Sequence, residues 1–376
     1  MAAKSPVKLN KKHGGKEFSN WFHFVGKVKP VKEQDKESGN WTDVPYFRTE
    51  TDDNGKLKKI IEFVIETAMS NDLKVKLSGK EMDYAYPYSS KHKKAATVAW
   101  EDRHDKTSYP DDTYHLIEPE WDKIDKLKEL IVTDGWFEVK GKYTPYSFIG
   151  ENNNEIKGVS RTINSVNSVI DGKVSENGEL KSIKVNNEEI DYVCDFDSPD
   201  FVEVNNFGMQ LGILSTYEDY DAGNTKVNGV YLTYGLTRSE PKDVELIVYN
   251  EEPEEGKKSL AEAFTSVERG DFLEVTGQDN NRATFTYVAV QAEPDDPFAD
   301  VDETSKQTRY EKVTNGAKKG LEIKSYVDGS YLRKFLTEDE ITKSINVIQN
   351  TNPSTNTYDP FSDVGVINIS EDDLPF

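Results

Sequence analysis

Aromatic and basic side chains are interleaved in the N-terminal part of this chain, a combination suited to binding rather than to bond-making chemistry. Aromatic faces stack on bases, and Lys and Arg cations pair with phosphates. We therefore predict a surface for single-stranded nucleic acid made of Trp21, His23, Lys27, Trp41, Arg48, Tyr84, Tyr86, Tyr88, Lys91, Lys93, Lys94 and Trp100. Aromatic residues are also ordinary core residues, so about half of those in this region are expected to be buried instead.

Strand alternation predicts which aromatic residues face outward. From Phe18 to Val28 the chain reads as a curved β-strand, in which neighbouring side chains point to opposite faces. Phe22, Phe24 and Val28 are expected inside, which leaves Trp21 and His23 on the outer face. The run Tyr84-Ala85-Tyr86-Pro87-Tyr88 is the least core-like, because it lies in a polar excursion beside the Lys91–Lys94 cluster.

The final residues carry a different chemistry. Three acids, Glu371, Asp372 and Asp373, precede Leu374-Pro375-Phe376. Proline keeps such a segment extended, an aromatic ring fills an apolar pocket, and carboxylates meet basic side chains at the pocket rim. We expect a docking peptide with partner-binding residues Asp372, Asp373, Leu374, Pro375 and Phe376. An acidic, disordered terminus without a partner has the same composition.

This tail resembles that of bacterial single-stranded DNA-binding proteins, especially the Gram-positive type, in which a DPF element precedes an acidic segment ending in Leu/Ile-Pro-Phe. Asp359-Pro360-Phe361 and Asp372–Phe376 match both parts, and Phe24-Val25-Gly26-Lys27-Val28 is similar to the family's first-strand signature. The resemblance implies docking onto replication, recombination and repair enzymes. The body is longer than the family's and carries an apparent second copy, so the resemblance does not extend to the family's tetramer or its base-stacking residues. A host-like tail on this unfamiliar body suggests a bacteriophage or mobile-element protein.

Signatures of enzymes are missing. The sequence contains no phosphate-cradling GxxxxGK[ST], no GxSxG and no HExxH. A single Cys and five His do not supply a Cys-rich zinc site. Clusters of acids can hold Mg²⁺ for a nuclease, but 69 acidic residues make chance clusters certain. We expect no enzyme, no cofactor and no metal.

Charge is distributed unevenly along the chain. The formal net charge is −22; residues 1–165 hold 28 Lys and Arg against 27 acids, whereas residues 166–376 hold 19 against 42. Residues 1–16 form a basic arm, which suits a phosphate backbone and equally a solvated tail. The single Cys194 fits a reducing compartment, and no apolar run is long enough for a membrane span or a signal peptide. We expect a cytoplasmic protein, in the host cytoplasm if phage-encoded, with no membrane partner.

Strand-like and helix-like runs predict a mainly β protein with minor α content. Asn54-Gly55 between two such runs predicts a hairpin, and Trp121 to Ile131 has helical spacing. Strands around one helix describe a Greek-key barrel of the oligonucleotide-binding type. Leu260 to Gly277 parallels Leu127 to Gly141, which predicts a second copy, although short patterns of this kind also recur by chance.

The predicted organisation is two tandem oligonucleotide-binding-like Greek-key barrels with a largely disordered acidic C-terminal tail. We divide the chain into a flexible basic arm (1–16), a DNA-binding domain (17–170), a connector hairpin (171–199), a second domain closed by residues 284–291 (200–292), a polar linker (293–357) and the docking tail (358–376). The linker has a possible short helix with capping-box spacing at Thr337–Glu340. A second DPF element, Asp296-Pro297-Phe298, fits the exit of the second domain.

Together these features predict a non-enzymatic protein that coats and protects single-stranded DNA and recruits replication, recombination or repair enzymes. The second domain, with few cations and many acids, is expected to be an accessory or assembly domain. One alternative is an acidic DNA mimic or inhibitor that sequesters tail-binding enzymes without binding DNA. Another is a metal-dependent nuclease or a virion component. The oligomeric state stays open.

Overall fold

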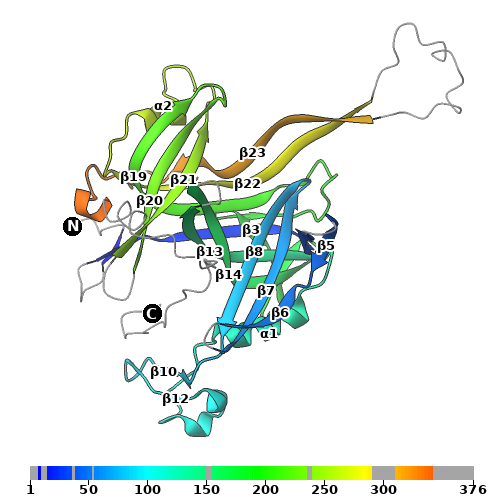
Figure 1. Cartoon of the computed structure of the whole chain (residues 1–376), viewed down its shortest axis with the longest axis vertical. Helices are drawn as coiled ribbons and strands as arrows, with labels where there is room; N and C mark the ends of the chain where they lie inside the picture. Colours follow the sequence, from blue (N-terminus) through cyan, green and yellow to red (C-terminus); the bar gives the residue numbers. More distant parts are fainter. Residues whose placement is uncertain are drawn as a thin grey trace, which may run out of the picture.

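The protein is mainly β. The structure, a computed structural model, describes residues 7–9, 15–35, 39–52, 55–149, 155–185, 187–234, 239–289 and 310–341. Most of its strands belong to one extended system of pairings that contains two closed rings of five strands each (Figure 1). In the described part of the chain, no helix is long and apolar enough to cross a membrane. The tail residues 358–376 and the internal DPF element lie outside the described residues.

The first ring consists of β3 (Asn20–Lys29), β7 (Leu57–Ala68), β8 (Asn71–Lys80), β13 (Trp136–Ile149) and β14 (Glu155–Ile170). Strand β3 pairs antiparallel with β7 and with β13, β7 pairs with β8, and β13 with β14. A parallel contact between β8 and β14 closes the ring. Helix α1 (Glu120–Leu130) lies between β8 and β13 in the chain and packs against β8 and β7, as its apolar spacing predicts.

The second ring repeats this order with β19 (Val204–Asp219), β20 (Asn224–Tyr234), β21 (Ser239–Tyr249), β22 (Phe272–Ala289) and β23 (Tyr310–Tyr326). Strand β19 pairs with β20 and β22, β20 with β21, and β22 with β23, and the closing contact between β21 and β23 is again parallel. Helix α2 (Leu260–Thr265) precedes β22 just as α1 precedes β13, and its Ser259–Glu262 capping box fixes its start.

The strand that closes the second ring differs from the prediction. Residues 284–289 belong to the long strand β22, and the closing strand is β23, which lies within the segment 293–357 expected to be a polar linker. The two strands extend away from the ring as a paired ribbon (Figure 1). Because this pairing joins backbone groups, the polar side chains of residues 310–326 do not prevent it. The predicted capping box further along is present: the backbone N–H of Thr337 donates to Glu340 Oε2, and that of Glu340 to Thr337 Oγ1.

Shorter elements flank the two rings. The N-terminal segment contains β1 (Lys8–Leu9) and β2 (Lys16–Glu17), which pair with each other, and β2 contacts β20 of the second ring. A hairpin of β4 (Val31–Gln34) and β5 (Trp41–Val44) precedes β6 (Phe47–Thr51), which joins β7 through the predicted turn at Gly55. Beyond β8 an excursion protrudes (Figure 1), built from β9 (Tyr84–Ala85), β10 (Tyr88–Ser89), β11 (Lys94–Ala95), β12 (Val98–Ala99) and the 3₁₀ turns η1 (Trp100–Asp102) and η2 (Lys106–Ser108).

The connector between the rings forms two short hairpins. The first pairs β15 (Lys173–Glu176) with β16 (Glu179–Lys181), and the second pairs β17 (Ile183–Val185) with β18 (Glu188–Ile190). Apolar side chains of the connector, Val174, Ile183 and Tyr192 among them, pack against Val25 of β3 and Val204 of β19. The connector therefore has a small core of its own on the outer side of the rings.

The rings are joined through their first strands. Strands β3 and β19 pair antiparallel, from Asn20 opposite Met209 to Val25 opposite Val204. The neighbours β13 and β22 extend the pairing on either side, so β14, β13, β3, β19, β22 and β23 form one continuous surface. Beneath it, buried residues of both rings, such as Phe22 and Phe207, belong to one apolar core.

Candidate functional site

A groove of about 720 Å³ opens on the outer face of this continuous surface. We call it the Trp21 groove. Residues from both rings and from the connector line it: Trp21, Phe22, His23, Lys140, Gly141, Asn164, Lys184, Asn187, Thr276 and Ser325. None of these described lining residues is acidic, although the chain as a whole carries a net charge of −22.

Trp21 is the aromatic platform of the groove. Phe22, Phe24 and Val28 are buried, as predicted from strand alternation, and Trp21 on the opposite face keeps 39% of its surface exposed. The indole lies over the backbone of Gly208 in β19, where a Cβ atom would overlap the ring. A glycine at this position of the second ring therefore lets an indole from the first ring approach the backbone of β19 closely.

His23 lines the groove but is not a free side chain. It was predicted to bind nucleic acid from the outer face, yet only 8% of it is exposed. Its Nε2 lies 2.8 Å from Oε1 of Glu138, and Lys140 Nζ lies 2.8 Å from the same oxygen. Burial by itself would raise the pKa of Glu138, but hydrogen bonds from His23 and Lys140 outweigh it and hold that pKa at about 2. The buried carboxylate fixes both side chains along the groove.

The remaining polar groups of the groove come from distant parts of the chain. A β-bulge at Lys140–Gly141 pairs these residues with Ser165 and Ile163, which leaves Asn164 as the extra residue, and Asn164 lines the groove. Lys184 and Asn187 come from the β17–β18 hairpin, where Lys184 Nζ lies 3.5 Å from the exposed carboxylate of Glu189. Exposed pairs of this kind contribute little stability, so Lys184 can exchange its partner.

Other predicted residues form a second, separate set on the excursion. Tyr84 is 53% exposed, and Lys91, Lys93 and Lys94 are exposed in and beside the turn that joins β10 to β11. Tyr86 and Tyr88 are half-buried. Trp41, on the β4–β5 hairpin, is 64% exposed. The structure thus leaves these side chains accessible but does not bring them into the Trp21 groove.

Three predicted residues make contacts within the protein. Trp100 is only 7% exposed and forms the core of the excursion with Ala85 and Val98, because this polar segment needs an apolar centre to fold. Arg48 donates to Glu50 at 2.7 Å and to Glu62 at 3.0 Å. Lys27 lies over the rings of Trp136 and Phe196, at 5.5 and 5.2 Å from their centroids.

The basic arm is partly engaged as well. Lys16 Nζ donates to the backbone carbonyl of Phe335 at 2.8 Å and to Glu340 at 2.9 Å, and Lys8 Nζ lies 3.7 Å from Glu17. The described end of the arm is therefore attached to the second ring through Lys16.

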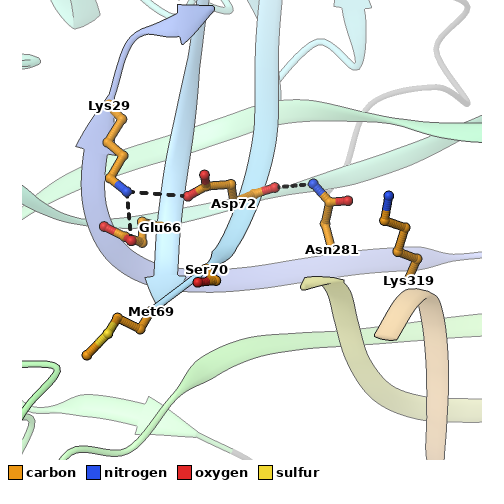
Figure 2. Close-up of a pocket in the computed structure, with 7 residues that line it drawn as sticks. All are labelled: Lys29, Glu66, Met69, Ser70, Asp72, Asn281 and Lys319. Atoms are coloured by element: carbon orange, nitrogen blue, oxygen red, sulfur yellow. Dashed lines mark hydrogen bonds and ion pairs between the residues drawn. The ribbon is translucent and has the colours of Figure 1, made fainter. Parts of the chain in front are cut away.

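A second hollow, of about 430 Å³, lies between the β7–β8 turn and strands β22 and β23 (Figure 2). Its lining mixes charges of both signs. Figure 2 shows Lys29 reaching two carboxylates, Glu66 at 2.7 Å and Asp72 at 3.6 Å, while Lys319 extends from the opposite side. Because Glu66 and Asp72 repel phosphate and already pair with Lys29, this hollow is a poorer anion site than the Trp21 groove.

Sequence reasoning did not single out Lys140, Lys184, Asn187, Asn164, Thr276 or Ser325. One signal was present for Lys140: it alternates with the apolar Phe137 and Val139 in a predicted strand, which assigns it to the outward face. The others required knowledge of which strands lie side by side. Among the described residues, no group of three or more His, Cys, Asp and Glu side chains could hold a metal ion.

No family model matches this sequence. No curated protein matches it either. Among solved structures, a deletion mutant of the single-stranded DNA-binding protein from Thermus aquaticus is similar over 74% of this chain and 98% of its own, with 9% sequence identity and a TM-score of 0.32.

Proposed function

We propose that this protein binds single-stranded DNA without strong sequence preference, coating and protecting it, and that it acts in the DNA replication, recombination or repair of a bacteriophage. The carrying observation is the Trp21 groove, in which a half-exposed indole lies among Lys140, Lys184 and neutral polar groups with no acid in the lining. Stacking on an indole and cationic contact to phosphates are the two means by which proteins hold single strands regardless of sequence.

The order of strand pairing supports this proposal. In each ring the first strand pairs with the second and the fourth, a helix precedes the fourth, and the third and fifth meet in parallel. This pattern agrees with a five-stranded Greek-key barrel of the oligonucleotide-binding type, an architecture that binds oligonucleotides on its second and third strands and on the loops that join strands one to two and four to five. We therefore interpret the two rings as tandem barrels of that type. In the first ring, Trp41 lies on the hairpin between the first and second strands, whereas the Trp21 groove is lined by the first, fourth and fifth strands.

The tail completes the proposed function. Asp372, Asp373, Leu374, Pro375 and Phe376 have the residue types of a docking peptide, and we propose that they recruit replication, recombination or repair enzymes to the coated strand. Deleting the last six residues is expected to abolish capture of such enzymes while DNA affinity stays unchanged or rises. Retained capture by the shortened protein would contradict the docking role.

The DNA-binding role is tested by fluorescence anisotropy of a labelled poly-dT oligonucleotide, titrated with the full chain at low and at high salt. We expect tight binding that weakens with salt, and much weaker binding of a matched duplex. Absence of binding to poly-dT at low salt would overturn the proposal. That result would favour the rival function, an acidic protein that sequesters tail-binding enzymes, for which the excess of acids after residue 165 is the supporting observation.

A further inference from the structure

We propose that one DNA strand crosses from the first ring to the second through the Trp21 groove, so that both rings bind the same strand at the same time. This inference rests on the proposed function and extends it, because the sequence assigns the second ring only an accessory or assembly role. It makes the junction of the rings a nucleotide-binding site, to which the second ring contributes Gly208, Thr276 and Ser325.

The floor of the groove runs across the junction without a step. Trp21 of β3 is opposite Gly208 of β19, Gly208 is opposite Thr276 of β22, and Thr276 is opposite Ser325 of β23. These four residues form one row perpendicular to the strands, with the hydroxyls of Thr276 and Ser325 2.6 Å apart. Laterally paired residues share a face of the sheet. A strand stacked on Trp21 therefore continues directly onto small polar residues of the second ring.

Side-chain size along this row leaves the path open. Gly208 has no side chain, Thr276 and Ser325 are short, and the indole of Trp21 lies over Gly208. A base stacked on the free face of Trp21 has Lys140 on the first-ring side and Lys184 on the connector side for its phosphates. The next nucleotide then meets the hydroxyls of Thr276 and Ser325, which donate to or accept from any base.

Charge distinguishes this crossing from the other hollow at the junction. The hollow of Figure 2 contains Glu66 and Asp72, and its Lys29 is already paired with both. In the Trp21 groove the carboxylate of Glu138 is 1% exposed, beneath His23 and Lys140, so it does not face an incoming phosphate. The exposed carboxylate of Glu189 lies 3.5 Å from Lys184 but does not line the Trp21 groove. Of the two hollows, the Trp21 groove is therefore the one whose lining contains cations and no acids.

The test uses charge on the second ring. In the full chain, Thr276→Glu and Ser325→Glu each introduce an acid into the groove, and Ser266→Glu introduces one at an exposed position after α2 that does not line it. We expect poly-dT affinity to fall at least about fivefold for each groove variant, because like charges placed together are strongly unfavourable. Ser266→Glu is expected to bind as the wild type does.

A variant that adds a positive charge distinguishes the electrostatic effect from a folding defect, because a folding defect would not raise the affinity. Ser325→Lys is expected to bind poly-dT more tightly and to steepen the dependence of log affinity on log salt by about 0.7, the contribution of one added phosphate contact to a single strand. The inference would be overturned if the wild-type protein binds poly-dT and all three variants, Thr276→Glu, Ser325→Glu and Ser325→Lys, bind it with the same affinity. That result would confine the strand to the first ring. Failure of the wild-type protein to bind poly-dT would instead overturn the proposed function.

Discussion

Arg161 and Asp279 join the two rings by a two-point ion pair. Nε and Nη2 of Arg161 donate to Oδ2 and Oδ1 of Asp279, each at 2.6 Å, and the Tyr143 hydroxyl donates to Oδ2 at 2.7 Å. Asp279 is fully buried. Burial by itself would lower the pKa of Arg161, but the Asp279 carboxylate raises it, so the guanidinium stays charged at the junction. Three elements, β13, β14 and β22, thus meet at one carboxylate.

Removing one partner of this pair should be costly. Asp279→Ala leaves the Arg161 charge buried without its partner, and we expect the free energy of unfolding to fall by about 3–5 kcal/mol. This free energy is measured by urea denaturation, with circular dichroism as the probe of unfolding. The double variant Arg161→Met/Asp279→Leu, which removes both charges, should recover most of the loss. A loss below about 1 kcal/mol in Asp279→Ala would mean that the pair does not hold the junction.

Glu138 should make stability depend on pH at the acid end. Its pKa is about 2 in the folded protein, below its ordinary value of 4.5, so the unfolded chain binds the proton more readily between these values. The stabilisation is fully present above about pH 4.5 and is lost as the pH falls toward 2, on the order of 3 kcal/mol in all.

The matched variants isolate this contribution from that of the other acids. Glu138→Gln lacks the titrating group. The difference between its free energy of unfolding and that of the wild type, measured by urea denaturation, should therefore shrink as the pH is lowered from 6 to 2.5. Glu189→Gln, at an exposed carboxylate, should show no such convergence. A deficit of Glu138→Gln that stays constant over this range would contradict the low pKa.

Local patterns were sufficient to predict much of the fold. The alternation of Phe22 and Phe24 with Trp21 predicted the inner and outer faces of β3, and helical spacing predicted α1 within one residue at each end. These elements have strong apolar periodicity. In contrast, β23 contributes only Leu321 and Ile323 to the described core, and most of its length is paired with β22 through the backbone, so its apolar pattern is too short to predict a strand of this length.

The candidate site was only partly predictable, for a physical reason. Trp21 was found because an aromatic residue on the polar face of a strand is visible in sequence. Lys184, Thr276 and Ser325 approach it only because β3 pairs with β19, and that register depends on long-range packing rather than on neighbouring residues. Trp100 was predicted to contact DNA because the excursion is polar in sequence. The few apolar residues that form its small core, Trp100 among them, could not be recognised from composition.

Ser70 holds the β7–β8 turn in a backbone conformation that costs stability. Its φ is 67°, in the left-handed region that L-residues other than Asn and Asp rarely adopt. Ser70→Gly relieves this, and we expect a net gain of about 0.5–1 kcal/mol after the added chain entropy of glycine. Thermal unfolding provides the measurement.

Gly55 provides the reciprocal variant. It has φ of 77° with no atom within 4 Å of an added Cβ, so Gly55→Ala should lose about 1 kcal/mol through backbone strain alone. If Ser70→Gly destabilises the protein, the side chain of Ser70 contributes more than its backbone conformation costs.

The cations of the excursion should act separately from the Trp21 groove. Lys91→Gln/Lys93→Gln/Lys94→Gln removes three exposed charges, and if each contacts a phosphate, the slope of log affinity against log salt should fall by about 2 for poly-dT. Lys257→Gln/Lys258→Gln, in an exposed loop of the second ring, is the comparison and should leave the slope unchanged. An unchanged slope in the triple variant would remove the excursion from the DNA path.

Gly208 should act on DNA only through Trp21. Trp21→Ala removes the stacking platform, and poly-dT affinity should fall roughly five- to 150-fold, which corresponds to the loss of one stacked base. Gly208→Val displaces the indole from its place on β19 and should lose a similar factor, although the glycine itself offers a base nothing to stack on. Because both changes remove the same interaction, the double variant should bind about as well as either single variant. Multiplied losses in the double variant would show that Gly208 affects DNA binding independently of Trp21.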